Sequence, residues 1–405
     1  MKTFMLWLLF LPFVLLGEWI DPPARSQKGY LVPTPDYKPV FPRDLGSHRE
    51  YGIEWWYWVG HLKEKGGERE FGFQSTVFRL AGDPKEAVKP ADGNFGNRQL
   101  YLAHSALSDL GQGTYLHHER ILREGWQAKA SSRDLDLKVA GIEVRMLDDG
   151  SGHQVVSRLP GDGKLELVMR PLKPLVTFGE RGLSRKGADP AAVSWYWTYP
   201  RLEAKGRLHY QGVEIEVEGT AWMDHEVSSS QLGKDLAGWD WTCVHLDDGT
   251  ELKAYRLRKN DGGSDPWSAV YWIDKEGRAT RVYAKDFTWN EEGRWTSPDT
   301  GLSYPTSVRI EANHPSRGKL VYRLRPLIEN QEFSGNGKGN DYWEGACEAL
   351  DVGLQRAVDG GAPELKQAET HLDPALPLRE LDDEATVWAA DAAAHTGRVL
   401  APAPA

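Results

Sequence analysis

The chain has 405 residues, a formal net charge of -10 and an ordinary apolar content, so two folded domains are the default expectation. The acidic balance argues against a nucleic-acid-binding protein, which needs a basic face. No run of lysine or arginine is long enough to hold an anionic membrane surface. The 17 tryptophans stand out. Since tryptophan is a large, rigid ring with one polar N–H, this excess favours an aromatic-lined cavity, although many of the rings are expected in the core.

The N-terminal segment reads MKTFMLWLLFLPFVLLGEW. Lys2 precedes an apolar run from Phe4 to Leu16, which has the length of a signal-peptide core rather than of a membrane span. We expect residues 1–19 to be a signal peptide or an uncleaved anchor, and the protein to be exported to the periplasm or anchored facing it. A buried helix is the alternative.

The middle of the chain has the pattern of a β protein. Residues 20–47 are rich in proline, aspartate and glycine and predict an extended arm. From there to about residue 350, short alternating runs such as FGFQSTVFRL and KLELVMRPL are separated by turn signals. The Asp-Gly pairs in LDDGSG (147–152) and LDDGT (246–250) are typical of hairpins. Helical periodicity is scarce, so the sequence predicts an antiparallel all-β sandwich or barrel.

Two tryptophan-rich stretches of equal length align end to end. EWWYWVGHL (54–62) and GWDWTCVHL (238–246) both have tryptophan in second position and both end in His-Leu. Because each stands near the start of one half of the β region, they indicate a duplicated barrel. We place the first barrel at 48–225 and the second at 226–355.

The C-terminal residues 356–405 differ in kind from the rest. They are rich in alanine, proline, aspartate and glutamate, with few strand-forming residues and no hairpin signal. We expect an irregular tail, with a short helix at about 377–395 as its one regular element.

Cysteine chemistry is restricted to Cys243 and Cys347. Neither stands in a CxxC pair, so a zinc site built on thiolates is nearly excluded. One disulfide is the most the chain can form. Export would permit it, although two reduced thiols are the favoured alternative.

Asp240, inside the second tryptophan stretch, is the first candidate for chemistry. Successive side chains of a strand face opposite ways, so Asp240 faces away from Trp239 and Trp241. If its face lines a cavity, burial raises the pKa of the carboxyl and makes it a Brønsted acid, while indole faces stabilise a cation. This equipment suits protonation of an alkene. The alternative is an ion pair with an arginine such as Arg256, which closes the barrel end.

Glu54 occupies the corresponding place in the first stretch. It shares a strand face with Trp56 and Trp58. For this carboxylate the structural alternative, a pair with an arginine such as Arg79 or hydrogen bonds to local N–H groups, is favoured over a direct role.

WMDHEVSSSQ (222–231) places three polar groups in succession. Alternation puts Asp224 and Glu226 on one face and His225 on the other. His225 is a candidate to orient a water or relay a proton. A metal site is disfavoured because no partner stands at a fixed spacing, and a capped turn is the remaining alternative.

A third aromatic block, SRKGADPAAVSWYWTYPRL (184–202), offers Tyr196 as a hydroxyl donor, with packing between barrels as the favoured alternative. No GxSxG elbow, GxGxxG loop after a strand, P-loop or HExxH motif is found. The common esterase, dinucleotide, NTPase and zincin classes are therefore excluded.

Together, EWWYWVGHL, the 184–202 block, WMDHEVSSSQL, GWDWTCVHLDDGTELKAYRLR and DYWEGACEA resemble the signature segments of the hydroxyneurosporene synthase (carotenoid 1,2-hydratase) family, which includes AttH-like secreted proteins. The resemblance runs from about 41 to 349. It implies two lipocalin-like (calycin) antiparallel barrels in tandem and a hydrophobic isoprenoid or acyl ligand. For the hydratase branch it implies cofactor-free, acid-catalysed addition of water to a C=C bond. For the AttH-like branch it implies a lipid carrier at the membrane, beside an ABC-type export system.

The resemblance places the aspartate of the WDW block on Asp240 and the histidine of the DHE block on His225. The expected site thus combines catalytic Asp240 and His225 with ligand-binding Trp239, Trp241, Glu54, Trp56, Trp58, Tyr196 and Trp222, without metal or cofactor.

Two departures from the family pattern affect these expectations. Val227 stands where the family usually has tryptophan, which favours a carrier or a different substrate. LDVGLQRAVDGGAPELKQ replaces the usual closing strand, so the second barrel either lacks its last strand or closes in another way.

Overall fold

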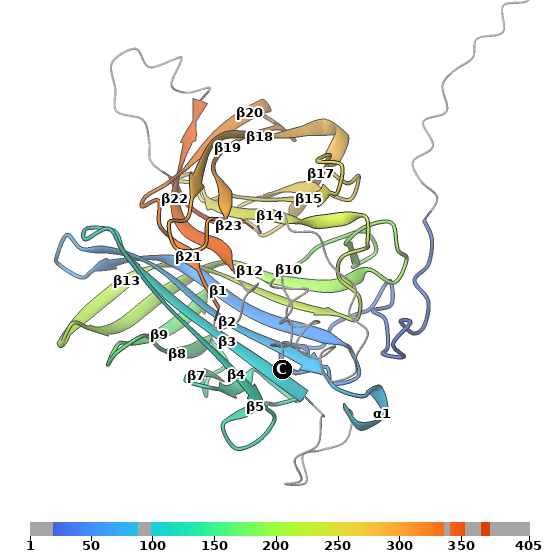
Figure 1. Ribbon diagram of the computed structural model, residues 1–405, viewed down its shortest axis with the longest axis horizontal. Coiled ribbons are helices and arrows are strands. Elements are labelled where there is room, and N and C mark those ends of the chain that lie inside the picture. Colours follow the sequence, from blue (N-terminus) through green and yellow to red (C-terminus); the bar gives the residue numbers. More distant parts are fainter. Residues whose placement is uncertain (1–18, 88–98, 336–340, 353–365, 373–405) are drawn as a thin grey trace, which may run out of the picture.

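The computed structural model describes residues 19–87, 99–335, 341–352 and 366–372. In these residues the chain is almost entirely β-structure, arranged as two lipocalin-like antiparallel barrels (Figure 1). The regular helical elements are short: η1 (Arg43–Leu45), α1 (Pro84–Ala87) and η2 (Ala284–Asp286). The all-β prediction is confirmed.

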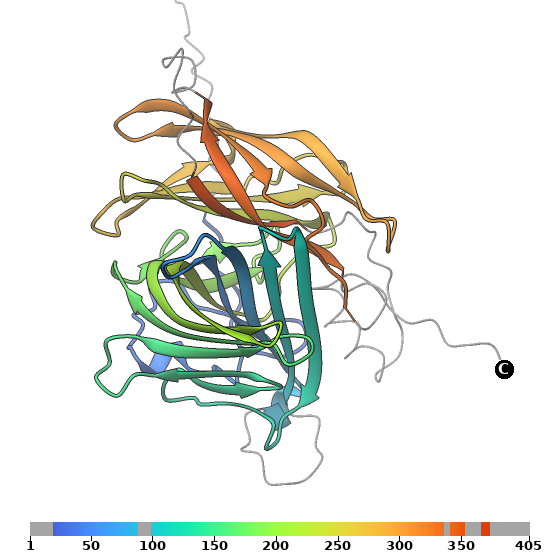
Figure 2. The ribbon, with the colours of Figure 1, turned by 90° about the vertical axis from the view of Figure 1, so that its left-hand side faces the viewer.

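The first barrel is one nearly closed sheet of thirteen described strands, which curve around a common axis in Figure 2. Its path is β4-β3-β2-β1-β13-β12-β9-β8-β7-β6-β5, with β10 and β11 added to β12. The strands are β1 (Ile53–Glu64), β2 (Glu70–Ala81), β3 (Gln99–Asp109), β4 (Thr114–Arg123), β5 (Ala128–Ala130), β6 (Asp136–Val139), β7 (Ile142–Met146), β8 (His153–Arg158), β9 (Lys164–Pro171), β10 (Val176–Thr177), β11 (Ser184–Arg185), β12 (Val193–Tyr210) and β13 (Val213–Ser228).

The second barrel is a sheet of ten described strands in the order β17-β16-β15-β14-β23-β22-β20-β19-β18, with β21 added to β22. The strands are β14 (Leu236–His245), β15 (Glu251–Lys259), β16 (Ala269–Ile273), β17 (Ala279–Tyr283), β18 (Phe287–Thr296), β19 (Ser303–His314), β20 (Gly318–Pro326), β21 (Glu332–Phe333), β22 (Tyr342–Asp351) and β23 (Lys366–Leu372).

The two tryptophan-rich stretches occupy equivalent places in the two barrels. The first forms β1, which pairs with the next strand β2 and with β13, the last described strand of its barrel. The second forms β14, which pairs with β15 and with β23, again the last described strand. The shared topology agrees with the duplication that the aligned stretches indicated.

Two predicted boundaries need correction. Strand β13 continues to Ser228, so residues 226–228 belong to the first sheet. Strand β23 lies within the stretch expected to be a tail, and it closes the second barrel between β14 and β22. The second barrel therefore does not lack a strand at this place, which Lys366–Leu372 fills. The predicted helix at 377–395 and residues 1–18 of the predicted signal peptide or anchor at 1–19 lie outside the described residues. No described helix is long and apolar enough to cross a membrane.

Alternation along the strands gives each barrel an interior and a second buried face. On β1, Trp56 and Trp58 enter the core of the first barrel, whereas Tyr57 and Val59 face outward. On β14, Val244 enters the core of the second barrel. Both faces of these strands are apolar, so each barrel must cover an outer face as well as fill its interior.

The outer faces cover each other. One apolar cluster combines Val59, Phe178 and Trp222 of the first barrel with Trp241 and Tyr271 of the second. Figure 1 shows the second barrel lying over β1 and β12 of the first. The barrels are thus joined by a continuous hydrophobic core.

A buried ion cluster fixes this contact at one end. Lys173 of the first barrel lies 2.6 Å from Glu251 of the second and donates to the carbonyl oxygens of Gly249 and Asp274, both at 2.7 Å. Arg201 reaches the other oxygen of Glu251 at 2.6 Å. Because Glu251 is fully buried and held by two cations, the relative position of the barrels is well defined.

Cys243 and Cys347 are buried and form no disulfide. Strand β23 runs between their strands, with Glu369 opposite Cys243 and Ala368 opposite Cys347. The two thiols therefore lie on strands that are not neighbours.

Gly72 of β2 offers a test of the barrel contact. A Cβ at this position would lie 2.8 Å from Cβ of Ala346 in the second barrel, closer than real atoms approach. We expect Gly72→Ala to lower the free energy of unfolding by about 1–3 kcal/mol because overpacking strains a dense core.

Urea unfolding measures this effect. Adding Ala346→Gly in the same chain should recover most of the loss. Equal stability of Gly72→Ala and the unaltered protein would show that the barrels are not packed as described.

Candidate functional site

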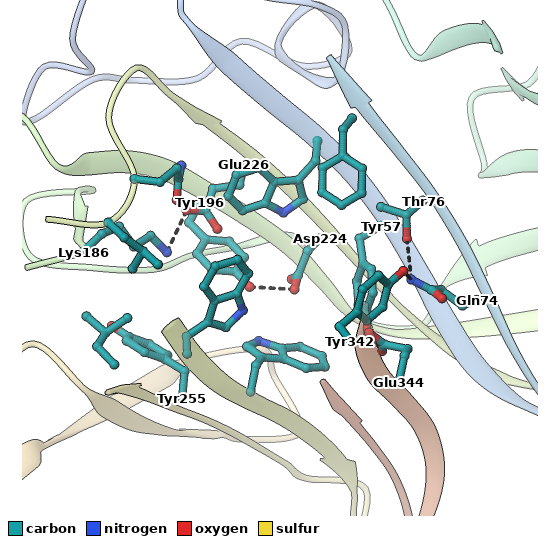
Figure 3. Close-up of a pocket in the computed structure, with 17 residues that line it drawn as sticks. Tyr57, Gln74, Thr76, Lys186, Tyr196, Asp224, Glu226, Tyr255, Tyr342 and Glu344 are labelled. Atoms are coloured by element: carbon teal, nitrogen blue, oxygen red, sulfur yellow. Dashed lines mark hydrogen bonds and ion pairs between the residues drawn. The ribbon is translucent and has the colours of Figure 1, made fainter. Parts of the chain in front are cut away.

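A pocket of about 100 Å³ lies between the outer faces of the two sheets (Figure 3). Strands β1, β2, β12 and β13 supply one side and β14, β15 and β22 the other. The lining side chains are Trp55, Tyr57, Gln74, Thr76, Phe78, Lys186, Tyr196, Asp224, Glu226, Gln231, Leu232, Trp239, Trp241, Tyr255, Leu257, Tyr342 and Glu344. Aromatic rings make up much of the wall, and both barrels are needed to form it.

Asp224 is the central carboxylate of the pocket and is almost completely buried. The Tyr196 hydroxyl donates to Oδ2 at 2.6 Å, and Trp222 Nε1 donates to Oδ1 at 2.8 Å. The Thr198 hydroxyl also donates to Oδ1. Burial, together with Asp224 and Glu226, raises the pKa of Tyr196 well above its usual value. The phenol therefore keeps its proton, and Asp224 acts as an acceptor of three hydrogen bonds.

Other polar groups stand on either side of Asp224 in Figure 3. Lys186 pairs with Glu226 at 2.7 Å on one side. On the other side Tyr57 donates to Glu344, which links the two barrels, and Gln74 donates to the Tyr342 hydroxyl at 2.9 Å. Since these groups are already partnered, the surface that remains for a ligand is mainly apolar.

The sequence-predicted residues divide among three places. Tyr196, Trp239 and Trp241 line the pocket. Trp222 lies beside it, with ring centroids 6.1 Å from Trp241. The remaining residues, described next, lie inside one barrel or the other.

Asp240 is fully buried but is absent from the pocket lining. Its carboxylate lies 3.2 Å from Arg258 Nε and 3.8 Å from Arg256 Nη1, and strand register places Arg256 directly opposite. The expectation of an uncharged acid in an apolar cavity is therefore corrected: Asp240 is part of an ion cluster. The predicted alternation was right, but the pocket lies on the tryptophan face of β14, opposite the carboxylate.

His225 also points away from the pocket, into the first barrel. Its Nε2 lies 2.9 Å from Glu54 Oε1, and its ring stacks on Trp56 with centroids 4.8 Å apart. Trp58 is in the same interior and donates to His153 Nε2 at 2.9 Å. The expected pair of Asp240 and His225 is thus not brought together, because the two side chains occupy different barrels.

Glu54 is the centre of a buried charge cluster. Arg79 Nε donates to Oε2 at 2.8 Å, and His48 Nδ1 lies 2.8 Å from Oε1. Burial alone would raise the pKa of Glu54. Arg79 and the imidazoles of His225 and His48 outweigh this effect and hold the pKa well below its usual range. The pairing with Arg79 is the structural alternative named from the sequence.

His48, Glu54 and His225 have ligand atoms within 4.8 Å of one another, a spacing that a metal ion accepts. The other carboxylate oxygen of Glu54 is bonded to a guanidinium, however, and His48 Nε2 lies 3.1 Å from Asp44. Arg79 already compensates the negative charge of Glu54. A dication bound here would lie next to that guanidinium and be repelled by it. A structural ion cluster fits these residues better than a metal site.

The pocket residues that sequence reasoning passed over are chiefly Asp224, Glu226, Tyr57, Lys186 and Glu344. Alternation did place Asp224 and Glu226 together, opposite His225. The sequence does not show on which side of β13 the second barrel lies. That position makes the outer face of β13 part of the pocket.

Arg79 tests the ion cluster. Arg79→Met leaves Glu54 as a buried, uncompensated charge, so we expect a loss of about 3–5 kcal/mol in the free energy of unfolding. The double variant Glu54→Gln/Arg79→Met should recover part of it.

The matched control is Lys65→Met, in a pair with Glu216 whose side chains are more than 60 % exposed, and its stability should stay close to that of the unaltered protein because exposed pairs contribute little. Denaturant unfolding distinguishes the variants. An Arg79→Met protein as stable as this control would contradict the assignment.

Comparison with known proteins now adds the family. The sequence matches the AttH-like family over residues 32–360. The crystal structure of a protein from Nitrosomonas europaea assigned as AttH is similar over 84% of this chain and 98% of that chain, with 31% identity and a TM-score of 0.71. Kievitone hydratase from Nectria haematococca shares the fold over 88% of this chain and 98% of its own, with 11% identity and a TM-score of 0.61. A search of curated protein sequences found no match. The chain belongs to the AttH-like family.

Proposed function

We propose that the pocket between the barrels binds an apolar ligand, an isoprenoid or acyl chain. The observation that carries the proposal is the composition of the wall. Aromatic side chains from both barrels, such as Trp55, Phe78, Trp239 and Trp241, make up much of the wall, and the carboxylates of Asp224 and Glu344 already accept hydrogen bonds. Such a surface gains most from an apolar occupant, because partnered polar groups add little to the affinity.

A lipid carrier is the simplest form of this function, because it needs a binding surface but no catalytic side chains. Bound lipid would be shielded between two barrels whose contact is otherwise apolar and buried. Export is an expectation from the N-terminal segment, and transfer to or from an ABC-type transporter would fit a lipid carrier at the membrane.

Hydration of a C=C bond is the second candidate. It is favoured by one observation: the carboxylates of Asp224 and Glu226 line the same pocket as the indole of Trp241. In such a reaction Glu226 takes a proton from its partner Lys186 and gives it to one alkene carbon, and the rings stabilise the cation. Water held by the Asp224 carboxylate then adds to the other carbon and returns its proton to the Lys186–Glu226 pair. Carotenoids are one class of alkene that could serve as the substrate of such a reaction.

The residues assigned to hydration differ from those predicted from the sequence. Asp240 and His225 lie outside the pocket lining, so Asp224 and Glu226 take their place. Asp224→Asn or Glu226→Gln should abolish turnover of an alkene while binding survives, and Asp240→Asn should leave turnover in place if it folds. Loss of turnover in a folded Asp240→Asn alone would contradict this relocation. Absence of product with isoprenoid alkenes, together with intact lipid extracted from the purified protein, would leave the carrier.

Trp241 tests the binding site itself. We expect Trp241→Ala to weaken the binding of a fluorescent fatty acid by tenfold or more, because loss of a buried aromatic contact costs about 1.5–3 kcal/mol. Fluorescence titration gives the dissociation constants.

Trp126 supplies the control, since it is 81% exposed and is not among the lining residues. Trp126→Ala should bind as the unaltered protein does. Equal affinities of the two variants would place the ligand elsewhere.

A further inference from the structure

Lys253 is a buried amine that the proposed function does not use. It belongs to β15 and is fully buried. Within the described part of the chain its Nζ has no hydrogen-bond partner. Tyr255 and Leu257, on the same face of β15, line the pocket, and Lys253 comes next on that face, behind the lining residue Tyr196.

Aromatic rings from both barrels enclose the amine. Nζ lies 3.2 Å from the ring centroid of Tyr196 and 3.7 Å from that of Phe178 in the first barrel. Tyr255 and Tyr271 of the second barrel are at 5.8 and 5.9 Å. The rings of Tyr196 and Tyr255 are near the amine and also line the pocket.

A second amine lies close by. Lys186 Nζ is 4.8 Å from the Tyr196 centroid and 5.7 Å from the Tyr255 centroid, so the two lysines share two rings. Lys186 has Glu226 as its ionic partner, whereas no ion pair of Lys253 occurs in the described residues. A carboxylate therefore compensates the charge of Lys186, whereas none is paired with Lys253 in these residues.

The balance of energies favours a neutral amine at Lys253. Removing an ammonium from water costs more free energy than cation–π contacts return. Burial lowers the pKa of Lys253, Asp224 and Glu226 oppose this shift, and Lys186 adds to it, so that the pKa is about 7. A desolvated lysine beside another cation has the features of an activated amine nucleophile.

We propose that Lys253 is a covalent binding site for an apolar aldehyde or ketone, which it captures as an imine. This inference rests on the proposed binding of apolar ligands in the pocket. The ligand's chain occupies the aromatic pocket and its carbonyl end reaches the amine, which requires the ring of Tyr196 to move aside.

The reaction balances without an oxidant or reductant. The nitrogen lone pair attacks the carbonyl carbon, the π pair moves to oxygen, and a proton passes from nitrogen to oxygen to give a carbinolamine. Lys186 supplies a proton to the hydroxyl, water leaves, and the nitrogen returns a proton to Lys186. The products are the imine and one water.

Decanal with sodium cyanoborohydride tests the proposal, since reduction fixes an imine as a stable amine. At one equivalent of decanal we expect a mass gain equal to the aldehyde less one oxygen atom, located by peptide mapping on Lys253. Lys253→Met should lose this adduct. Lys63→Met, which removes a 60% exposed lysine, should keep it. Label spread over surface lysines without excess at Lys253, or label on Lys186 alone, would overturn the proposal.

Decanol separates this inference from the proposed function, because it fills the pocket without reacting. Decanol that binds both the unaltered protein and Lys253→Met, with no adduct from decanal, overturns the covalent site and leaves the binding function. If decanol does not bind the unaltered protein, both fail. Bound decanol in Lys253→Met also shows that the variant retains its pocket.

The pH dependence provides a second readout. With a pKa of about 7, the neutral fraction of Lys253 rises about tenfold from pH 6 to pH 8, and the initial labelling rate should rise with it. The groups facing the amine are Asp224, Glu226, Lys186, Cys243 and the phenols of its cage. A labelling rate at Lys253 that is unchanged over this range would count against a neutral amine.

Discussion

The burial of both faces of β1, β13 and β14 is the constraint on which the rest of the structure depends. A barrel strand ordinarily presents one face to the interior and the other to water. Here the outward faces are apolar too, with Tyr57 on β1 and Trp241 on β14 as examples. They are removed from water only when the second barrel lies over the first. The position of the barrels, and the pocket between them, follow from that requirement.

The same constraint separates structural charges from groups that a ligand can reach. Glu54 and Asp240 point into barrel interiors, where arginines compensate them and close packing leaves them structural. Asp224 points the other way, into the shared pocket, although it is next to His225 in the chain. One residue of strand register therefore decides whether a carboxyl supports the fold or faces a ligand.

Much of the fold could be predicted from the sequence, and the site only in part. Alternation and Asp-Gly turns indicated an all-β chain, and the aligned tryptophan stretches indicated the duplication. Alternation also assigned the neighbours of Asp240 to the correct faces, but it does not say which face lines a cavity, because that depends on contacts between distant strands. Strand β23 was missed since its sequence, KQAETHL, is short and polar and follows a stretch that contains Gly360, Gly361 and Pro363.

The central claim is that ligand binds between the barrels and not inside either one. A crystal structure with a brominated fatty acid tests it directly, because anomalous scattering locates the bromine without reference to the protein. The account predicts a peak between β1 and β14, beside Tyr57 and Trp241. A peak in the interior of the first barrel, near Trp56, or of the second, near Trp343, would contradict it.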